Sequence, residues 1–106
     1  MFFEFRQYRV RPGKMDEWVP YMENEIIPYQ QSKGMVVVGS FTCPTEDDLY
    51  IWIRRFENEE EKKKLYAAVY ENDVWQKEFL PKVAELIDRE KIKVTLMEPT
   101  SRSIIR

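Results

Sequence analysis

Histidine is absent from this chain of 106 residues, and cysteine occurs only once, at Cys43. The missing imidazole removes the commonest general acid–base group and the commonest transition-metal ligand. A histidine-ligated haem and a structural zinc site are therefore excluded, and we expect no cofactor. A single cysteine cannot form an internal disulfide, which is typical of a reducing compartment.

Long apolar runs and an excess of one charge are also missing. The 17 basic and 19 acidic residues are interspersed and give a net charge of −2, which argues against nucleic-acid binding and a polybasic membrane patch. No stretch of about 18 consecutive apolar residues exists, and no basic segment precedes an apolar run at the N-terminus. We expect a cytoplasmic protein without membrane insertion, consisting of one domain over residues 1–106.

Two stretches have the apolar spacing of amphipathic helices. The first runs from Lys14 to about Ser32. It contains Pro20 and Pro28, which predict a kink or an irregular end instead of a straight rod. Trp18 lies on its apolar stripe and is assigned to the core.

Capping residues predict another helix, which we expect to begin at Asn58 and to run through about Tyr70. Asp73 is predicted to cap a further helix, in which an apolar stripe is interrupted by Pro81. Trp75 falls on this stripe and is also assigned to the core.

Four segments have strand character, with a Pro44-containing turn between the second and the third. They are Phe2–Val10, Met35–Thr42, about Leu49–Phe56 and Lys91–Met97. The resulting order, βαββαβ, is that of an α+β ferredoxin-like fold. It predicts a four-stranded antiparallel sheet with helices on one face.

Both faces of the first strand carry large aromatic side chains as well as polar or charged ones. One register presents Phe3, Phe5, Gln7 and Arg9, and the other presents Phe2, Glu4, Arg6, Tyr8 and Val10. The valine-rich second strand is predicted at a sheet edge, where an exposed apolar strand invites pairing. We therefore expect two sheets to pack face to face in a homodimer and to form an α/β barrel.

Several motifs, taken together, resemble domains of the NIPSNAP family across nearly the whole chain. They are Phe3-Glu4-Phe5-Arg6-Gln7-Tyr8, Arg11-Pro12-Gly13-Lys14-Met15-Asp16-Glu17, Ile27-Pro28, Val38-Gly39-Ser40-Phe41, Trp52-Ile53-Arg54-Arg55-Phe56-Glu57 and Asn72-Asp73-Val74-Trp75-Gln76. The resemblance implies a dimeric α/β barrel with a ferredoxin-like subunit. Related barrels include cofactor-independent monooxygenases, dehydratase-like stress proteins and haem-degrading enzymes.

The chain departs from the family pattern at two positions. Trp52 stands near where relatives often carry a histidine, and Phe41 stands where they often carry a tryptophan. Chemistry that depends on that histidine is therefore closed to this chain. The family has no single agreed activity, so membership implies a fold more firmly than a function.

The residues expected to line a pocket inside the barrel, between the two sheets, mix aromatic and charged side chains. They are Glu4, Arg6, Tyr8, Phe41, Tyr50, Trp52 and Arg54. An arginine among aromatic rings would orient an anionic or carbonyl group. Glu4 would act as a base if burial raised its pKa, whereas an ion pair with Arg6 or Arg54 would only neutralise buried charge at an interface.

Three functions remain open from the sequence. The first is binding of a small hydrophobic or anionic molecule without catalysis. The second is a cofactor-independent enzyme, of monooxygenase or isomerase type, acting on an aromatic or carbonyl substrate through an electrostatic pocket. The third is a purely structural dimer with a filled barrel. The absence of histidine and of nucleophile and metal motifs favours the first.

Overall fold

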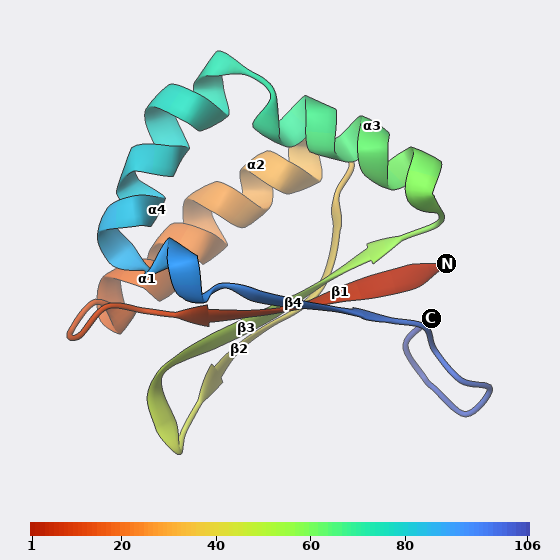
Figure 1. The fold of residues 1–106 in the computed structure, drawn as a ribbon, viewed down its shortest axis with the longest axis horizontal. Coiled ribbons are helices and arrows are strands. Elements are labelled where there is room, and N and C mark those ends of the chain that lie inside the picture. Colours follow the sequence, from red (N-terminus) through yellow and green to blue (C-terminus); the bar gives the residue numbers. More distant parts are fainter.

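An antiparallel sheet with the strand order β2-β3-β1-β4 carries the fold of this computed structural model, which describes residues 1–106. Its strands are β1 (Phe2–Arg9), β2 (Val36–Cys43), β3 (Glu46–Phe56) and β4 (Lys93–Met97). All of the helices lie on one side of the sheet, as the view in Figure 1 shows. The predicted ferredoxin-like α+β architecture is confirmed, and the valine-rich β2 is an edge strand as expected.

The helical layer consists of two long irregular helices and one regular helix. The first comprises α1 (Met15–Tyr21), a π-helical turn (Met22–Ile26) and α2 (Ile27–Ser32). The regular helix α3 (Glu59–Tyr70) follows, and then come a π-helical turn (Val74–Phe79) and α4 (Leu80–Leu86). A short 3₁₀ turn, Arg89–Lys91, precedes β4, which therefore starts two residues later than predicted.

The two π-helical turns have a common cause in the sequence. Each ends two residues before a proline, Pro28 in one helix and Pro81 in the other. A proline has no N–H to donate and its ring crowds the carbonyl four residues earlier, so the preceding turn widens. The irregularity predicted for the proline-containing first helix is thus a π turn within a continuous helix.

Asparagines cap the second and third helices. The Asn58 side chain accepts a hydrogen bond from the Glu61 backbone N–H, as predicted. The cap predicted at Asp73 is wrong, because Asp73 makes no capping hydrogen bond. Asn72 accepts the Trp75 backbone N–H in its place, and its amide also reaches the backbone carbonyls of the preceding helix. The shift of one residue lets Asn72 end one helix and begin the next.

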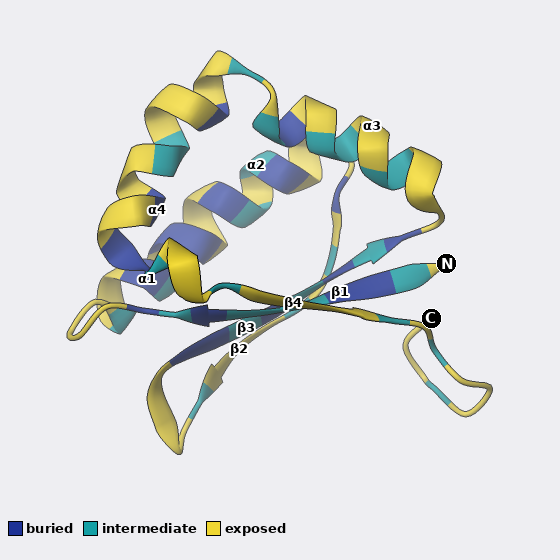
Figure 2. Cartoon of the chain, viewed as in Figure 1, coloured by how far each residue is buried: buried dark blue, intermediate teal, exposed yellow.

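Buried and less buried residues alternate along β3, so the two faces of the sheet differ. Figure 2 shows buried residues in the strands and in the helices that cover them. The main core cluster lies between the sheet and the helices and joins Tyr8, Tyr50 and Trp52 to helical side chains such as Trp18. The opposite face is open, and Phe41 on β2 is half exposed there. No helix in the structure has the length and apolar character needed to cross a membrane. The cytoplasmic location stays a prediction.

Candidate functional site

The side chains predicted to line a pocket lie almost entirely on the helix-covered face of the sheet. Glu4 pairs with Arg54, Arg6 with Trp52, and Tyr8 with Tyr50 across β1 and β3. Directly paired residues of antiparallel strands point to the same face. These six therefore contact helices, and the expectation that they would face a second sheet is wrong.

Phe41 alone among the predicted residues lies on the open face. It pairs with Ile51 and has no place in the core clusters. Its ring lies over Gly39, where an added Cβ would approach Phe41 Cε2 to 2.5 Å. The glycine thus leaves room for an aromatic ring to lie flat along an edge strand.

Glu4 is the centre of a buried charged cluster. Its carboxylate accepts hydrogen bonds from Arg54 at 2.7 and 3.1 Å, and Arg6 lies 3.4 Å away. Lys62 on α3 approaches the second carboxylate oxygen to 3.3 Å, and the Tyr66 hydroxyl donates a short hydrogen bond to the same oxygen. Both predicted ion pairs of Glu4, with Arg6 and with Arg54, are present.

The charged cluster determines the ionisation of its members. Burial raises the pKa of Glu4, but the Arg54 guanidinium, the Tyr66 hydrogen bond and Arg6 outweigh it and hold this pKa below its ordinary value. Burial also raises the pKa of Tyr66, and the neighbouring carboxylate adds to this effect. Glu4 is thus an anion at neutral pH and a weak base, which contradicts a role in proton abstraction.

Arg54 on β3 forms hydrogen bonds to side chains on two helices. It donates to Gln30 on α2 at 2.8 Å and to Tyr70 on α3 at 2.6 Å, as well as to Tyr66 at 2.9 Å. Its guanidinium lies 4.8 Å from the centroid of the Trp52 ring, within range of a cation–π interaction. Every side of this arginine is occupied, so its role is structural.

Tyr50 belongs to the core beside the cluster. Its hydroxyl shares a hydrogen bond with Ser40 on β2. Burial raises the pKa of Tyr50 to about 12, so the hydroxyl stays protonated. The residue packs against Trp18 and Tyr8 and does not line the cavity described next.

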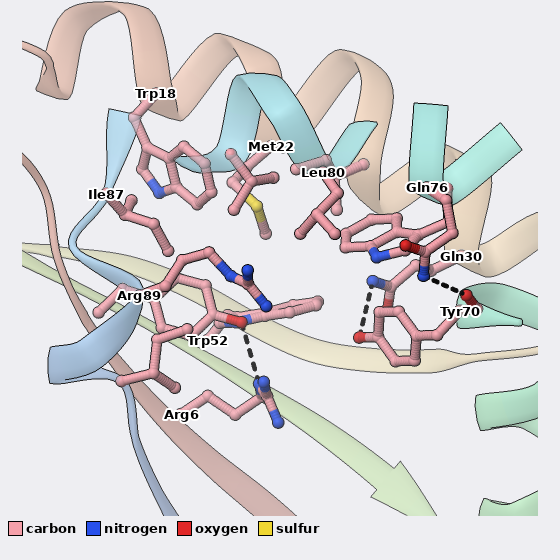
Figure 3. A pocket seen from close by; sticks show the side chains of 15 residues that line it. Arg6, Trp18, Met22, Gln30, Trp52, Tyr70, Gln76, Leu80, Ile87 and Arg89 are labelled. Atoms are coloured by element: carbon pink, nitrogen blue, oxygen red, sulfur yellow. Dashed lines mark hydrogen bonds between the residues drawn. The ribbon is translucent and has the colours of Figure 1, made fainter. Parts of the chain in front are cut away.

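A cavity of about 280 Å³ lies between the sheet and the helices (Figure 3). Eleven of its fifteen lining residues are hydrophobic. Three predicted residues line it, namely Arg6, Tyr8 and Trp52. The other lining residues are Trp18, Met22, Ile26, Gln30, Tyr70, Trp75, Gln76, Leu80, Val83, Ile87, Arg89 and Ile92. Both π-helical turns contribute to its walls, and such turns are frequent at functional sites.

Two cavity-lining residues each carry a buried hydrogen-bond donor that has no partner and no accessible surface. These donors are the indole Nε1 atoms of Trp18 and Trp52, and these side chains are 0% and 1% exposed. Sequence reasoning placed Trp18 and Trp75 in the core, which is correct, but missed that both also line a cavity. The only signal available was their shared apolar stripe, which does not distinguish a packed ring from a cavity wall.

The remaining polar groups at the cavity are mostly donors. Arg6 donates to the Tyr8 hydroxyl at 3.1 Å, and Gln30 and Gln76 donate to Tyr70. Arg89 also lines the cavity. No lining residue is acidic, and no cluster of three or more His, Cys, Asp or Glu side chains is arranged to hold a metal ion. The arrangement suits an apolar ligand that presents hydrogen-bond acceptors.

Sheet order, register and helix placement define a protein of the ferredoxin-like α+β class with a cavity beneath its helices. The NIPSNAP family model matches residues 3–103, and the chain belongs to the NIPSNAP family. It is 24% identical over 99 residues to human protein NipSnap homolog 3A and 24% identical over 102 residues to mouse protein NipSnap homolog 3B. These matches cover 93% and 92% of the chain, but the chain spans only about 40% of the length of either relative.

Solved structures extend the comparison. Protein Atu4242 from Agrobacterium tumefaciens superposes with a TM-score of 0.89 at 26% identity, with complete coverage of both chains. A NIPSNAP family protein, Atu5224, from the same organism gives a TM-score of 0.87 at 25% identity, with coverage of 99% and 98%. An antibiotic biosynthesis monooxygenase shares the fold, with a TM-score of 0.67 at 14% identity and coverage of 94% and 99%.

Proposed function

We propose that this domain binds a small, largely apolar molecule carrying a hydrogen-bond acceptor, and that the ligand occupies the cavity between sheet and helices. The observation that carries the proposal is the cavity itself, in which eleven of fifteen lining residues are hydrophobic and none is acidic. The polar lining residues include two arginines and two glutamines, and N–H donors of this kind suit a ligand that presents a hydrogen-bond acceptor.

The shape and lining of the cavity support the same proposal. Its volume of about 280 Å³ lies near the lower end of ligand pockets, which suits a ligand of one or two rings. All three tryptophans of the chain are among its lining residues.

The alternative, a cofactor-independent enzyme of monooxygenase or isomerase type, has weaker support. The likeness to the antibiotic biosynthesis monooxygenase is one of fold. The only buried carboxylate, Glu4, is outside the cavity lining and is held by Arg54, Tyr66 and Lys62. The geometry therefore supports binding better than proton abstraction.

Calorimetric titration with 2-naphthamide, a neutral two-ring acceptor, tests binding in the cavity. Leu80→Trp should fill the cavity and abolish binding, whereas Lys77→Trp, on the exposed side of the same helical segment, should leave binding intact. Trp52→Phe removes part of an aromatic wall of the cavity and should weaken binding by about tenfold. Absence of binding to the wild-type protein, or binding that survives both Leu80→Trp and Trp52→Phe, would refute the proposal.

We also propose that two copies of the chain pair through the open face of the sheet. Val36, Val38 and Phe41 on the edge strand β2 are each more than one third exposed, and partly buried Ile51 and Ile53 lie beside them. Exposed apolar residues on an edge strand favour association. Light scattering should give about twice the 12.9 kDa chain mass, and Phe41→Glu should lower it to that of one chain. A monomer mass for the wild type at micromolar concentration would exclude this dimer.

A further inference from the structure

Arg89 is the one cation at the cavity without a partner in the protein. It lies in the 3₁₀ turn before β4, and its side chain points into the cavity in Figure 3. None of the hydrogen bonds or ion pairs of the chain involves its guanidinium, and the acidic neighbour Asp88 lies 4.0 Å from Lys91 and accepts the Glu90 backbone N–H. Arg89 therefore presents an unneutralised fork of donors at the mouth of an apolar cavity.

The other cavity arginine is already neutralised. Arg6 faces the Glu4 carboxylate at 3.4 Å and donates to the hydroxyls of Tyr8 and Tyr66. Arg6 has little capacity left to bind another anion, because its positive charge already faces the carboxylate of Glu4. An anionic group entering the cavity would thus find its counter-charge at Arg89.

The single unpartnered guanidinium at the cavity limits the negative charge that a ligand can carry. One free guanidinium matches a group of single negative charge, and its planar fork matches a carboxylate in a two-point geometry. A dianionic phosphate would leave one charge unpaired beside an apolar wall, which is costly. The less deeply buried aromatic lining residues, Tyr70 and Trp75, favour a flat aromatic body over a flexible chain.

We infer that the ligand class of the cavity is a small aromatic monocarboxylic acid, and that Arg89 is the residue that selects its carboxylate. The inference rests on the proposed function, because it assumes that the cavity is a binding site. Arg89 is a specificity-determining residue in this account, whereas the apolar walls of the cavity hold the ring system. The exposed position of Arg89 suits capture of an anion from solvent.

The test compares 2-naphthoate with 2-naphthamide, which have the same ring system and differ in charge. Calorimetry at low salt should show 2-naphthoate binding the wild-type protein about tenfold more tightly than the amide. Arg89→Gln should remove this preference by weakening the binding of 2-naphthoate much more than that of 2-naphthamide. Arg89→Lys should restore only part of it, because an ammonium lacks the planar fork.

The matched control is Arg102→Gln, which removes the same charge from an exposed residue outside the cavity lining and should keep the preference. Equal binding of the two probes to the wild type, or a preference that persists in Arg89→Gln, would overturn the assignment of Arg89 while the binding function stands. Tighter binding of 2-naphthyl phosphate than of 2-naphthoate would overturn the ligand class. Failure of both naphthoate and naphthamide to bind would instead remove the proposed function.

Discussion

Neutralising Glu4 tests the account of the buried charged cluster most directly. The substitution Glu4→Gln keeps the size of the side chain and removes its charge. It leaves Arg54, Arg6 and Lys62, all within 3.4 Å of the carboxylate in the native structure, without a common counter-ion. The cluster then consists of three cations beside an amide.

The size of the effect follows from the burial of the pair. Glu4 and Arg54 are 1% and 0% exposed, and removal of one partner of such a pair costs about 3–5 kcal/mol. The amide oxygen of glutamine still accepts from Arg54, so we expect a loss near the lower limit, about 3 kcal/mol. Small domains are stable by only about 5–15 kcal/mol, so the variant should fold with a much lower midpoint.

Urea unfolding followed by tryptophan fluorescence measures this loss, because all three tryptophans surround the same cavity. The protein concentration must be fixed, since association would shift the midpoint. The matched control is Glu46→Gln. It breaks the exposed pair with Arg9, whose side chains are 36% and 52% exposed, and should cost less than about 1 kcal/mol.

The result that would refute this reasoning is a similar, small loss for Glu4→Gln and Glu46→Gln with unchanged denaturant slopes. A second check is the double variant Glu4→Gln with Arg54→Met. It should lose less than the sum of its two single variants, because neither charge is then left alone. Strict additivity would show that the pair contributes no coupling.

Three further predictions concern the same network and the helix caps. The pKa of Glu4 is lower in the folded state than its unfolded value of about 4.5, so its ionisation contributes fully to the free energy of unfolding above pH 4.5. This contribution is lost as the pH falls through the folded-state pKa. The free energy of unfolding should therefore change less with pH below 4.5 in Glu4→Gln than in the wild type. Tyr66→Phe removes a donor to the same carboxylate and should cost about 1–3 kcal/mol in urea unfolding, whereas an unchanged midpoint would show that Lys62 alone suffices. Asn72→Ala should cost about 1–2 kcal/mol and Asp73→Ala almost nothing, and the reverse order of midpoints would restore the cap at Asp73.

The sequence by itself determined the order of elements, because that information is local. Apolar spacing, the Asn58 cap and the proline positions lie within single segments, so βαββαβ and the edge position of β2 followed from the chain alone. The family was also readable from motifs spread along the chain. The cap at Asp73 was wrong by one residue because Asn72 and Asp73 are both good capping residues, and only the helix packing selects between them.

Only the tertiary structure decided which face of the sheet holds the site. Alternation with a period of two places Glu4, Arg6 and Tyr8 on one side of β1 but does not say which side the helices cover. That choice depends on partners more than 20 residues away, such as Gln30 and Tyr66, whose polar groups satisfy Arg54 and Glu4.

The cavity was equally invisible in the sequence. Its lining includes Arg6 near the start of the chain and Arg89 near its end. The cavity is the volume left unfilled after side chains from five or more helices and strands have packed together. A packed ring and a cavity-lining ring have the same spacing along a helix. Local patterns therefore determine which segments form helices and strands, whereas an unfilled volume is a property of all of them together.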